Sequence, residues 1–161
     1  MSELLHDVYL AGSLRNPIIP DIGNYLRTMG LTVFDDWFAG GKIADDEWQA
    51  YEQRRGRDYT VALNGYVAMH IFEFDKFHLD RSRSIVLVLP AGKSGHLELG
   101  YMVGTGKPGY VLLDQLPERF EVMYLFANGI YLKAEPIAHA ILNKLGREVP
   151  NYAIHQAGNT E

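Results

Sequence analysis

Short apolar runs alternate along the chain with segments whose apolar residues recur at helical spacing. The apolar runs are typical of buried β-strands and comprise residues 7–11, 31–34, 85–90, 110–113 and 129–132. Helical spacing is found in residues 20–29, 45–55, 59–78, 96–103, 117–126 and 136–145, with Gly65 as a weak point. Strands that alternate with helices form parallel sheets, because a parallel pair needs a long crossover connection. The pattern predicts one α/β domain over residues 1–148, with a five-stranded parallel sheet of the flavodoxin-like or Rossmann-like type, and a polar tail over residues 149–161.

Residues 84–113 form the central strand–turn–helix–strand unit of this pattern. Its first strand leads into a glycine-rich turn, and Glu98 is expected in the first turn of the helix that follows. Ligands bind at this edge of parallel sheets. An exposed acid could serve there only to complement the helix dipole. That explanation suits a carboxylate between Leu97 and Leu99 less well, so Glu98 is a candidate for chemistry.

Two further side chains are expected to approach the same edge. Asp75 lies on the long helix that precedes the central strand, and Tyr9 lies on the first strand. Two carboxylates at one cleft can act as nucleophile and proton donor in glycosidic cleavage, and a tyrosine hydroxyl can hold one of them. The alternatives are a surface role for Asp75 and plain core packing for Tyr9.

The loops after the first two strands carry the remaining candidates. Gly12, Ser13 and Arg15 offer backbone amides, a hydroxyl and a guanidinium, which suit a phosphate or a sugar hydroxyl, or else form a capped surface turn. In the second loop Trp37 could stack on a flat base or cover the core. Asp45 and Asp46, at its end, are expected to cap the next helix.

Composition excludes several classes of function. The chain has 161 residues, a formal net charge of −5 and no cysteine. The negative charge argues against a nucleic-acid polymer as partner, and the lack of thiols removes disulfides and cysteine-based zinc sites. The start lacks a leader pattern and no apolar stretch reaches a membrane-spanning length, so a cytoplasmic location without membrane contact is expected.

Three short patterns resemble known binding motifs but lack residues that those motifs require. The AGKS piece after the central strand resembles the end of a phosphate-binding P-loop, but the glycine required upstream is Leu87. The HLE piece resembles a zinc deaminase signature, whose cysteine ligands are missing. His70 and His78 with Glu73 could share a helix stripe, but spacing places no third ligand, so neither a metal nor a cofactor is expected.

Three pieces in order, VYLAGS, FEFD and SGHLELGYMVGTGKP, together resemble the nucleoside 2-deoxyribosyltransferase family. Its superfamily also contains N-glycosidases that hydrolyse deoxynucleoside 5′-monophosphates. The resemblance spans residues 8–113. It implies that Glu98 attacks the anomeric carbon of the deoxyribose, that Asp75 moves a proton at the base, and that Tyr9 holds Glu98. It also implies that Asp36 and Trp37 help bind the base.

The resemblance leaves the branch open. Transfer of the deoxyribosyl group to another nucleobase is the first reading. Ser94, Gly95 and His96, beside the nucleophile, are substrate-binding candidates, and His96 is specific to neither branch. In the hydrolase branch the loop with Ser13 and Arg15 would hold a 5′-phosphate, and Ser94 could replace a serine that the hydrolases carry at the position of Gly92. The transferases also use an asparagine from a neighbouring subunit, which Asn128 could match, so a homo-oligomer is implied. A nucleotide-binding or sensor module without turnover is the non-enzymatic alternative.

Overall fold

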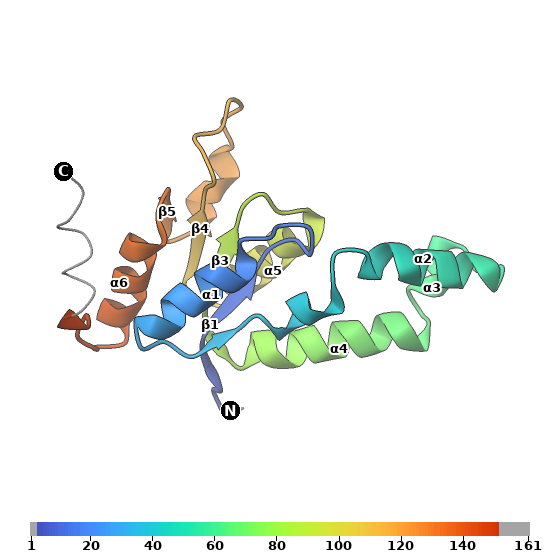
Figure 1. Cartoon of the computed structure of the whole chain (residues 1–161), viewed down its shortest axis with the longest axis horizontal. Coiled ribbons are helices and arrows are strands. Elements are labelled where there is room, and N and C mark those ends of the chain that lie inside the picture. The colour runs from blue at the N-terminus through green and yellow to red at the C-terminus, as the bar shows by residue number, and fades with distance from the viewer. Residues whose placement is uncertain (1–2, 152–161) are drawn as a thin grey trace.

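The computed structural model describes residues 3–151 and shows a five-stranded parallel sheet flanked by helices (Figure 1). The strand order is β2-β1-β3-β4-β5. The strands are β1 (His6–Ala11), β2 (Val33–Phe34), β3 (Ser82–Val88), β4 (Gly109–Leu112) and β5 (Gly129–Tyr131). The helices are α1 (Ile19–Thr28), α2 (Ala44–Arg54), α3 (Tyr59–Ala62), α4 (Tyr66–Asp80), α5 (Lys93–Gly104) and α6 (Ala134–Lys144), with 3₁₀ turns η1 (Asp36–Gly40) and η2 (Val122–Phe126). The predicted flavodoxin-like or Rossmann-like fold class is confirmed.

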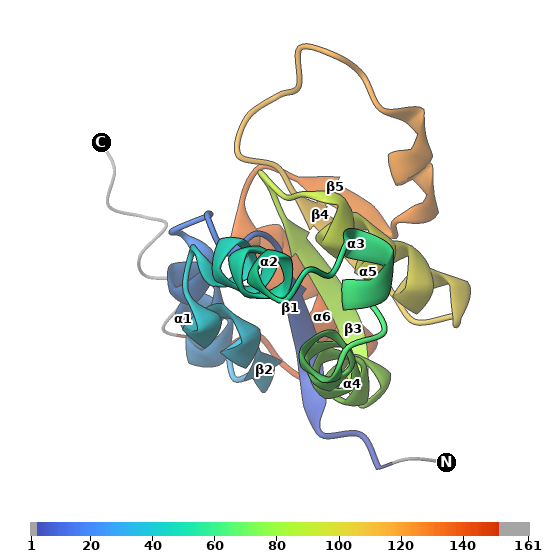
Figure 2. The same ribbon diagram turned by 90° about the vertical axis from the view of Figure 1, so that its right-hand side faces the viewer.

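Alternate residues of the strands face two different helix layers. Val8 and Leu10 of β1 pack with α1 and α6, whereas Tyr9 and Ala11 face α4 and α5. The same alternation continues in β3, as expected for a sheet that is covered on both faces. Figure 2 shows α1 and α5 on opposite sides of the strands. The register of β1 therefore aims the Tyr9 ring at the α4–α5 layer.

The long helix predicted over residues 59–78 is two helices. Gly65 adopts an extended conformation, with φ −84° and ψ 159°, and stands as the N-cap of α4 after the short α3. A helical backbone cannot continue through such a residue, so the chain turns there. Helix α2, α3 and the outer end of α4 project beyond the sheet edge as a helical arm (Figure 1).

Two helix starts differ from the sequence-based expectation. Helix α5 begins at Lys93 and has Gly92 as its N-cap, so Glu98 lies in the second turn rather than the first. The prediction that Asp45 and Asp46 cap α2 is also wrong. Ile43 is the N-cap without a side-chain hydrogen bond, and both aspartates lie in the first turn. There they complement the positive end of the helix dipole, which is a weaker role than capping.

The predicted segments at the sheet borders are shorter than expected. Strand β2 has two residues, and of the predicted helix over residues 117–126 only the 3₁₀ turn η2 forms. Helix α6 ends as predicted, with Gly146 at a φ of +67° just beyond it. No helix within residues 3–151 combines the length and apolar character needed to cross a membrane.

Candidate active site

Glu98 and Tyr9 meet where β1 passes under α5. The Tyr9 hydroxyl donates a hydrogen bond of 3.0 Å to Glu98 Oε1, and the Tyr9 side chain is fully buried. Burial raises the pKa of Glu98 to about 7, against the opposing effect of this hydrogen bond and with a further increase from the charge of Asp75. The pKa of the Tyr9 hydroxyl is raised by burial and by both carboxylates, so Tyr9 acts as a donor.

Asp75 faces the same cleft from α4. Burial raises the pKa of its carboxyl to about 6, and Oδ1 is buried without a hydrogen-bond partner among the described residues. Near neutral pH the two acids therefore share about one proton as a coupled pair. Because the pKa of Glu98 is the higher of the two, the cleft favours that proton on Glu98. The hydrogen bond from Tyr9 opposes this preference, because it lowers the pKa of Glu98.

The α4–α5 cleft, into which both carboxyls open, has a volume of about 470 Å³, which suits a small organic ligand. Its walls are mostly apolar side chains of α4 and α5, closed at the outer end by α2 and by Leu63 after α3. The lining residues are Asp45, Trp48, Leu63, Ala68, Ile71, Phe72, Asp75, Lys76, Leu79, Ser94, Leu97, Glu98 and Tyr101.

The β1–α1 loop lies directly beside the start of α5. A Cβ on Gly95 would lie 3.5 Å from the backbone N and O of Gly12, in ordinary van der Waals contact, and 2.8 Å from Leu87 Cδ1, so the two backbones lie close together here. In the loop the Ser13 hydroxyl accepts a bond from the backbone N of Arg15. The Arg15 guanidinium reaches Asp46 of α2 at 2.8 Å in an exposed ion pair.

Trp37 and Asp36 lie in η1 and do not line the cleft. The indole N–H of Trp37 donates to the carbonyl oxygen of Leu10 at 2.8 Å, and its ring packs against buried apolar residues on both faces of the sheet. In this structure Trp37 therefore covers the hydrophobic core rather than lining the cleft where a base could stack on it. Asp36 is exposed.

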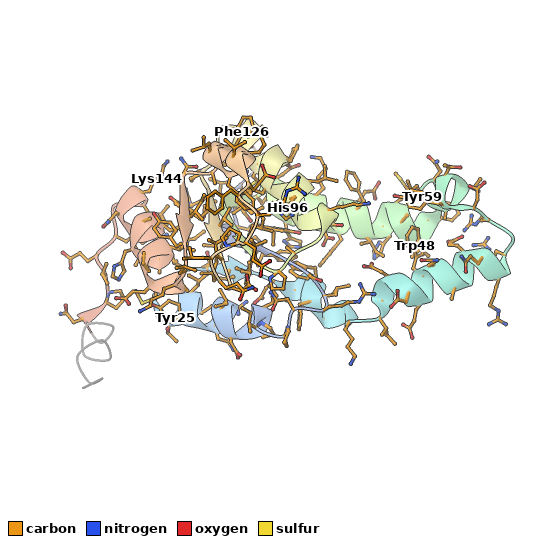
Figure 3. All side chains as sticks on the ribbon, turned by 90° about the horizontal axis from the view of Figure 1, so that it is seen from above. Tyr25, Trp48, Tyr59, His96, Phe126 and Lys144 are labelled. Atoms are coloured by element: carbon orange, nitrogen blue, oxygen red, sulfur yellow. The ribbon has the colours of Figure 1, made fainter. Side chains whose placement is uncertain are left out.

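Ser94 lines the cleft, whereas His96 points from α5 toward the long β4–β5 connection. His96 Nδ1 lies 2.8 Å from the carbonyl oxygen of Gly92, and Nε2 lies 2.9 Å from the Tyr124 hydroxyl. Figure 3 shows His96 on the side of the molecule that carries Phe126. The side chain therefore connects α5 to η2 and does not face the carboxylates.

Asn128 lies just before β5 and does not line the α4–α5 cleft of its own chain. Its side-chain Oδ1 accepts a bond from the backbone N of Gly109, and its own backbone N donates to the carbonyl oxygen of Gly109. Gly109 is the first residue of β4 and pairs with Ile85 of β3. Asn128 therefore connects the start of β4 to the start of β5 in this chain.

His78 has a different partner from the one that the helix stripe suggested. Its Nδ1 lies 2.9 Å from Nε2 of His6, and its ring stacks on Phe34 with centroids 4.0 Å apart. Burial lowers the pKa of both imidazoles, and their mutual repulsion adds to this for His6. Within residues 3–151 no three His, Asp or Glu side chains gather as metal ligands do.

The structure adds Asp45, Trp48, Lys76 and Tyr101 to the residues expected at the site. Lys76 is held by Asp80 at 2.5 Å and by the Tyr101 hydroxyl at 3.1 Å. The sequence places Trp48 on one side of α2, but only the fold of the arm shows that this side faces α4. No known protein family matches the chain, and neither does any curated protein sequence.

Proposed function

We propose that this protein cleaves the N-glycosidic bond of 2′-deoxynucleosides through a covalent intermediate on Glu98. The observation that carries the proposal is the Tyr9–Glu98 hydrogen bond in a cleft that Asp75 also lines. A buried carboxylate held by a neutral donor, next to a second carboxyl with a raised pKa, is the arrangement that double displacement needs.

In the first step an oxygen of ionised Glu98 bonds to C1′ of the deoxyribose. The bond from C1′ to the base nitrogen breaks, and its electron pair leaves with the base. Protonated Asp75 supplies a proton to the base, so the base leaves neutral. The negative charge thus passes from Glu98, now an ester, to Asp75, and the net charge of the cleft does not change.

In the second step the nitrogen of another base attacks C1′ and the Glu98 ester bond breaks. Asp75 takes the proton of the incoming base, so the enzyme returns to its first state and the sugar keeps its configuration. Transfer to a base is the first reading, and attack by water would give hydrolysis instead.

The test incubates the protein with deoxyinosine and free adenine, and separately with a deoxynucleoside monophosphate alone, and follows the bases by chromatography. Deoxyadenosine and hypoxanthine are expected from the first mixture. Glu98→Ala should abolish both, and a 2′-fluorinated substrate should leave a sugar adduct on Glu98 in the mass spectrum. If the parent releases no base from either substrate, the catalytic proposal fails, and binding without turnover would then indicate a sensor module.

The hydrolase alternative has one observation in its favour, which is the position of Arg15. Its ion pair with Asp46 is exposed, with side chains 59% and 62% accessible, and such pairs contribute little to stability. The guanidinium can therefore turn to a phosphate next to Gly12 and the start of α5. In this branch Asp46→Asn lowers KM for a deoxynucleoside monophosphate and Arg15→Ala raises it, while KM for the nucleoside stays constant.

We also propose that the chain works as a homo-oligomer. Large apolar side chains remain exposed on α4, on α5 and along the β4–β5 connection; Phe120 is 89% exposed and Leu97 74%. Exposed apolar surface on this scale is typical of an interface. Sedimentation velocity tests the assembly, and a monomer at micromolar concentration would refute it.

A further inference from the structure

The second tryptophan, Trp48, has a buried N–H group without an acceptor. Its Nε1 is shielded from solvent and has no hydrogen-bond partner within the described part of the chain. A buried donor without a partner costs free energy, on the order of 1–3 kcal/mol in proteins. Trp37 shows how the same fold satisfies an indole, because its N–H reaches the carbonyl oxygen of Leu10.

Trp48 lines the outer end of the α4–α5 cleft, which holds the reacting carboxyls at its inner end. In Figure 3 its ring lies in the arm between the ribbons of α2 and α4. Ala68, Ile71 and Phe72 of α4 line the cleft beside it. A flat apolar ligand can fill this space, and an indole N–H can then offer it a single donor.

The charges of the cleft disfavour a phosphate group and permit an uncharged base. Asp45, Asp75 and Glu98 line it, and among residues 3–151 Lys76 is the only basic residue of the lining and is bound to Asp80. A phosphate would be repelled from such a wall, whereas an uncharged base would not. Arg15, in the β1–α1 loop, does not line the cleft and is paired with Asp46.

We propose that the outer end of the α4–α5 cleft binds the nucleobase, and that the Trp48 N–H donates a hydrogen bond to an acceptor atom of that base. The proposal rests on the proposed N-glycosidic chemistry for the identity of the ligand. It moves base recognition from the loop with Asp36 and Trp37 to the helical arm. A ring nitrogen of adenine or the exocyclic oxygen of hypoxanthine is the kind of acceptor required.

The test compares Trp48→Phe, which keeps an aromatic ring and removes the N–H, with Tyr51→Phe. Tyr51 lies on the same helix, is half exposed and does not line the cleft. Calorimetric titration with free adenine should show affinity weakened by about 5- to 30-fold in Trp48→Phe and unchanged in Tyr51→Phe. Equal affinity of the parent and Trp48→Phe, or no binding of adenine to the parent at millimolar concentration, would overturn the proposal.

Adenine analogues that lack one ring nitrogen, namely 1-, 3- and 7-deazaadenine, identify the acceptor. One of them should bind the parent as weakly as adenine binds Trp48→Phe, and should lose nothing further in the variant. If all three analogues lose the same factor in the variant as adenine does, the N–H contacts none of these atoms and the proposal fails.

The melting temperature without ligand tests independently whether the Trp48 N–H lacks a partner in the protein. Trp48→Phe should melt no lower than the parent, because it removes an unpaired donor, whereas Trp37→Phe should melt lower, because it leaves the Leu10 carbonyl without its donor. If Trp48→Phe weakens self-association and leaves adenine affinity intact, the indole serves an interface and the inference is wrong. If adenine binds through Trp48 but no nucleoside is cleaved, the proposed function fails and this inference stands.

Discussion

Replacing Tyr9 with phenylalanine tests the link between the Tyr9 hydroxyl and the protonation of Glu98. The change removes one oxygen from a fully buried side chain and keeps the ring that packs against Phe34. A hydrogen bond to a charged group contributes about 1.5–3 kcal/mol, which corresponds to about 1–2 pH units in the ionisation of its partner. Without the hydroxyl, the pKa of Glu98 therefore rises further above its present value of about 7.

The size of the rate loss follows from the proton that the two acids share. Catalysis needs Glu98 ionised and Asp75 protonated, while the pKa values of about 7 and about 6 favour the reverse arrangement. Raising the pKa of Glu98 makes the productive form rarer, so kcat/KM at pH 7 should fall by roughly 5- to 50-fold. At high pH Glu98 is ionised in both proteins, so the difference should close above about pH 9.

The assay is base release from a deoxynucleoside, measured as kcat/KM from pH 5 to pH 10. Tyr101→Phe is the matched control, because Tyr101 lines the same cleft but donates its hydroxyl proton to Asp80 at 2.7 Å. Its profile should keep the limbs of the parent. A Tyr9→Phe deficit that is constant across the whole pH range would refute the reasoning, since it would mean that the hydroxyl does not act through the ionisation of Glu98.

Three further predictions concern stability, and melting temperature measures each of them. The raised pKa of Glu98 means that its contribution to stability is complete below about pH 4.5 and is lost as the pH rises through about 7. Glu98→Gln should therefore melt roughly 2–10 °C higher than the parent at pH 8 and equally at pH 4.5. An unchanged melting point at pH 8 would contradict the burial argument. Glu52→Gln should lower the melting point at pH 8, because this buried carboxylate holds Arg57 through two hydrogen bonds of 2.5 and 2.9 Å; a higher melting point would show that the pair costs more than it contributes. The lowered pKa of His6 and His78 means that their contribution to stability is present above about pH 6.5 and is lost as the pH falls. His78→Gln should therefore flatten the decline of the melting temperature between pH 7 and pH 5. An unaltered slope would rule out the histidine pair as the cause of that decline.

The sequence predicts the sheet well, because buried strands bounded by glycines are a local signal. It predicts one helix over residues 59–78 and marks Gly65 only as a weak point, whereas the backbone turns there and two helices form. It misplaces the start of α5, since Lys93 and Ser94 have no helical periodicity of their own, although the helix begins at Lys93. Such boundaries depend on contacts between segments distant in the sequence.

Some residues of the candidate site could be predicted from the sequence and others could not. The residues Tyr9, Asp75 and Glu98 could be selected from the sequence as a group expected at one edge of the sheet. In the structure they meet over the face of the sheet that α4 and α5 cover. Trp37 and Trp48 could not be told apart, since both are tryptophans that follow acidic residues outside the strands. Only the fold shows that one indole has a backbone acceptor and the other has none.

The helical arm gives the two ends of the cleft different mechanical support. The Tyr9–Glu98 contact stands on the sheet, while α2, α3 and the outer turns of α4 have few buried side chains; within α4 only Leu79, near the sheet, is buried. Segments with so little buried surface open at a lower free energy than the core does. The arm can therefore unfold locally and admit or release a ligand while the reacting groups keep their positions. Amide hydrogens of α2 and α3 would then exchange much faster than those of β1 and β3, and a bound base would slow the exchange of the arm alone.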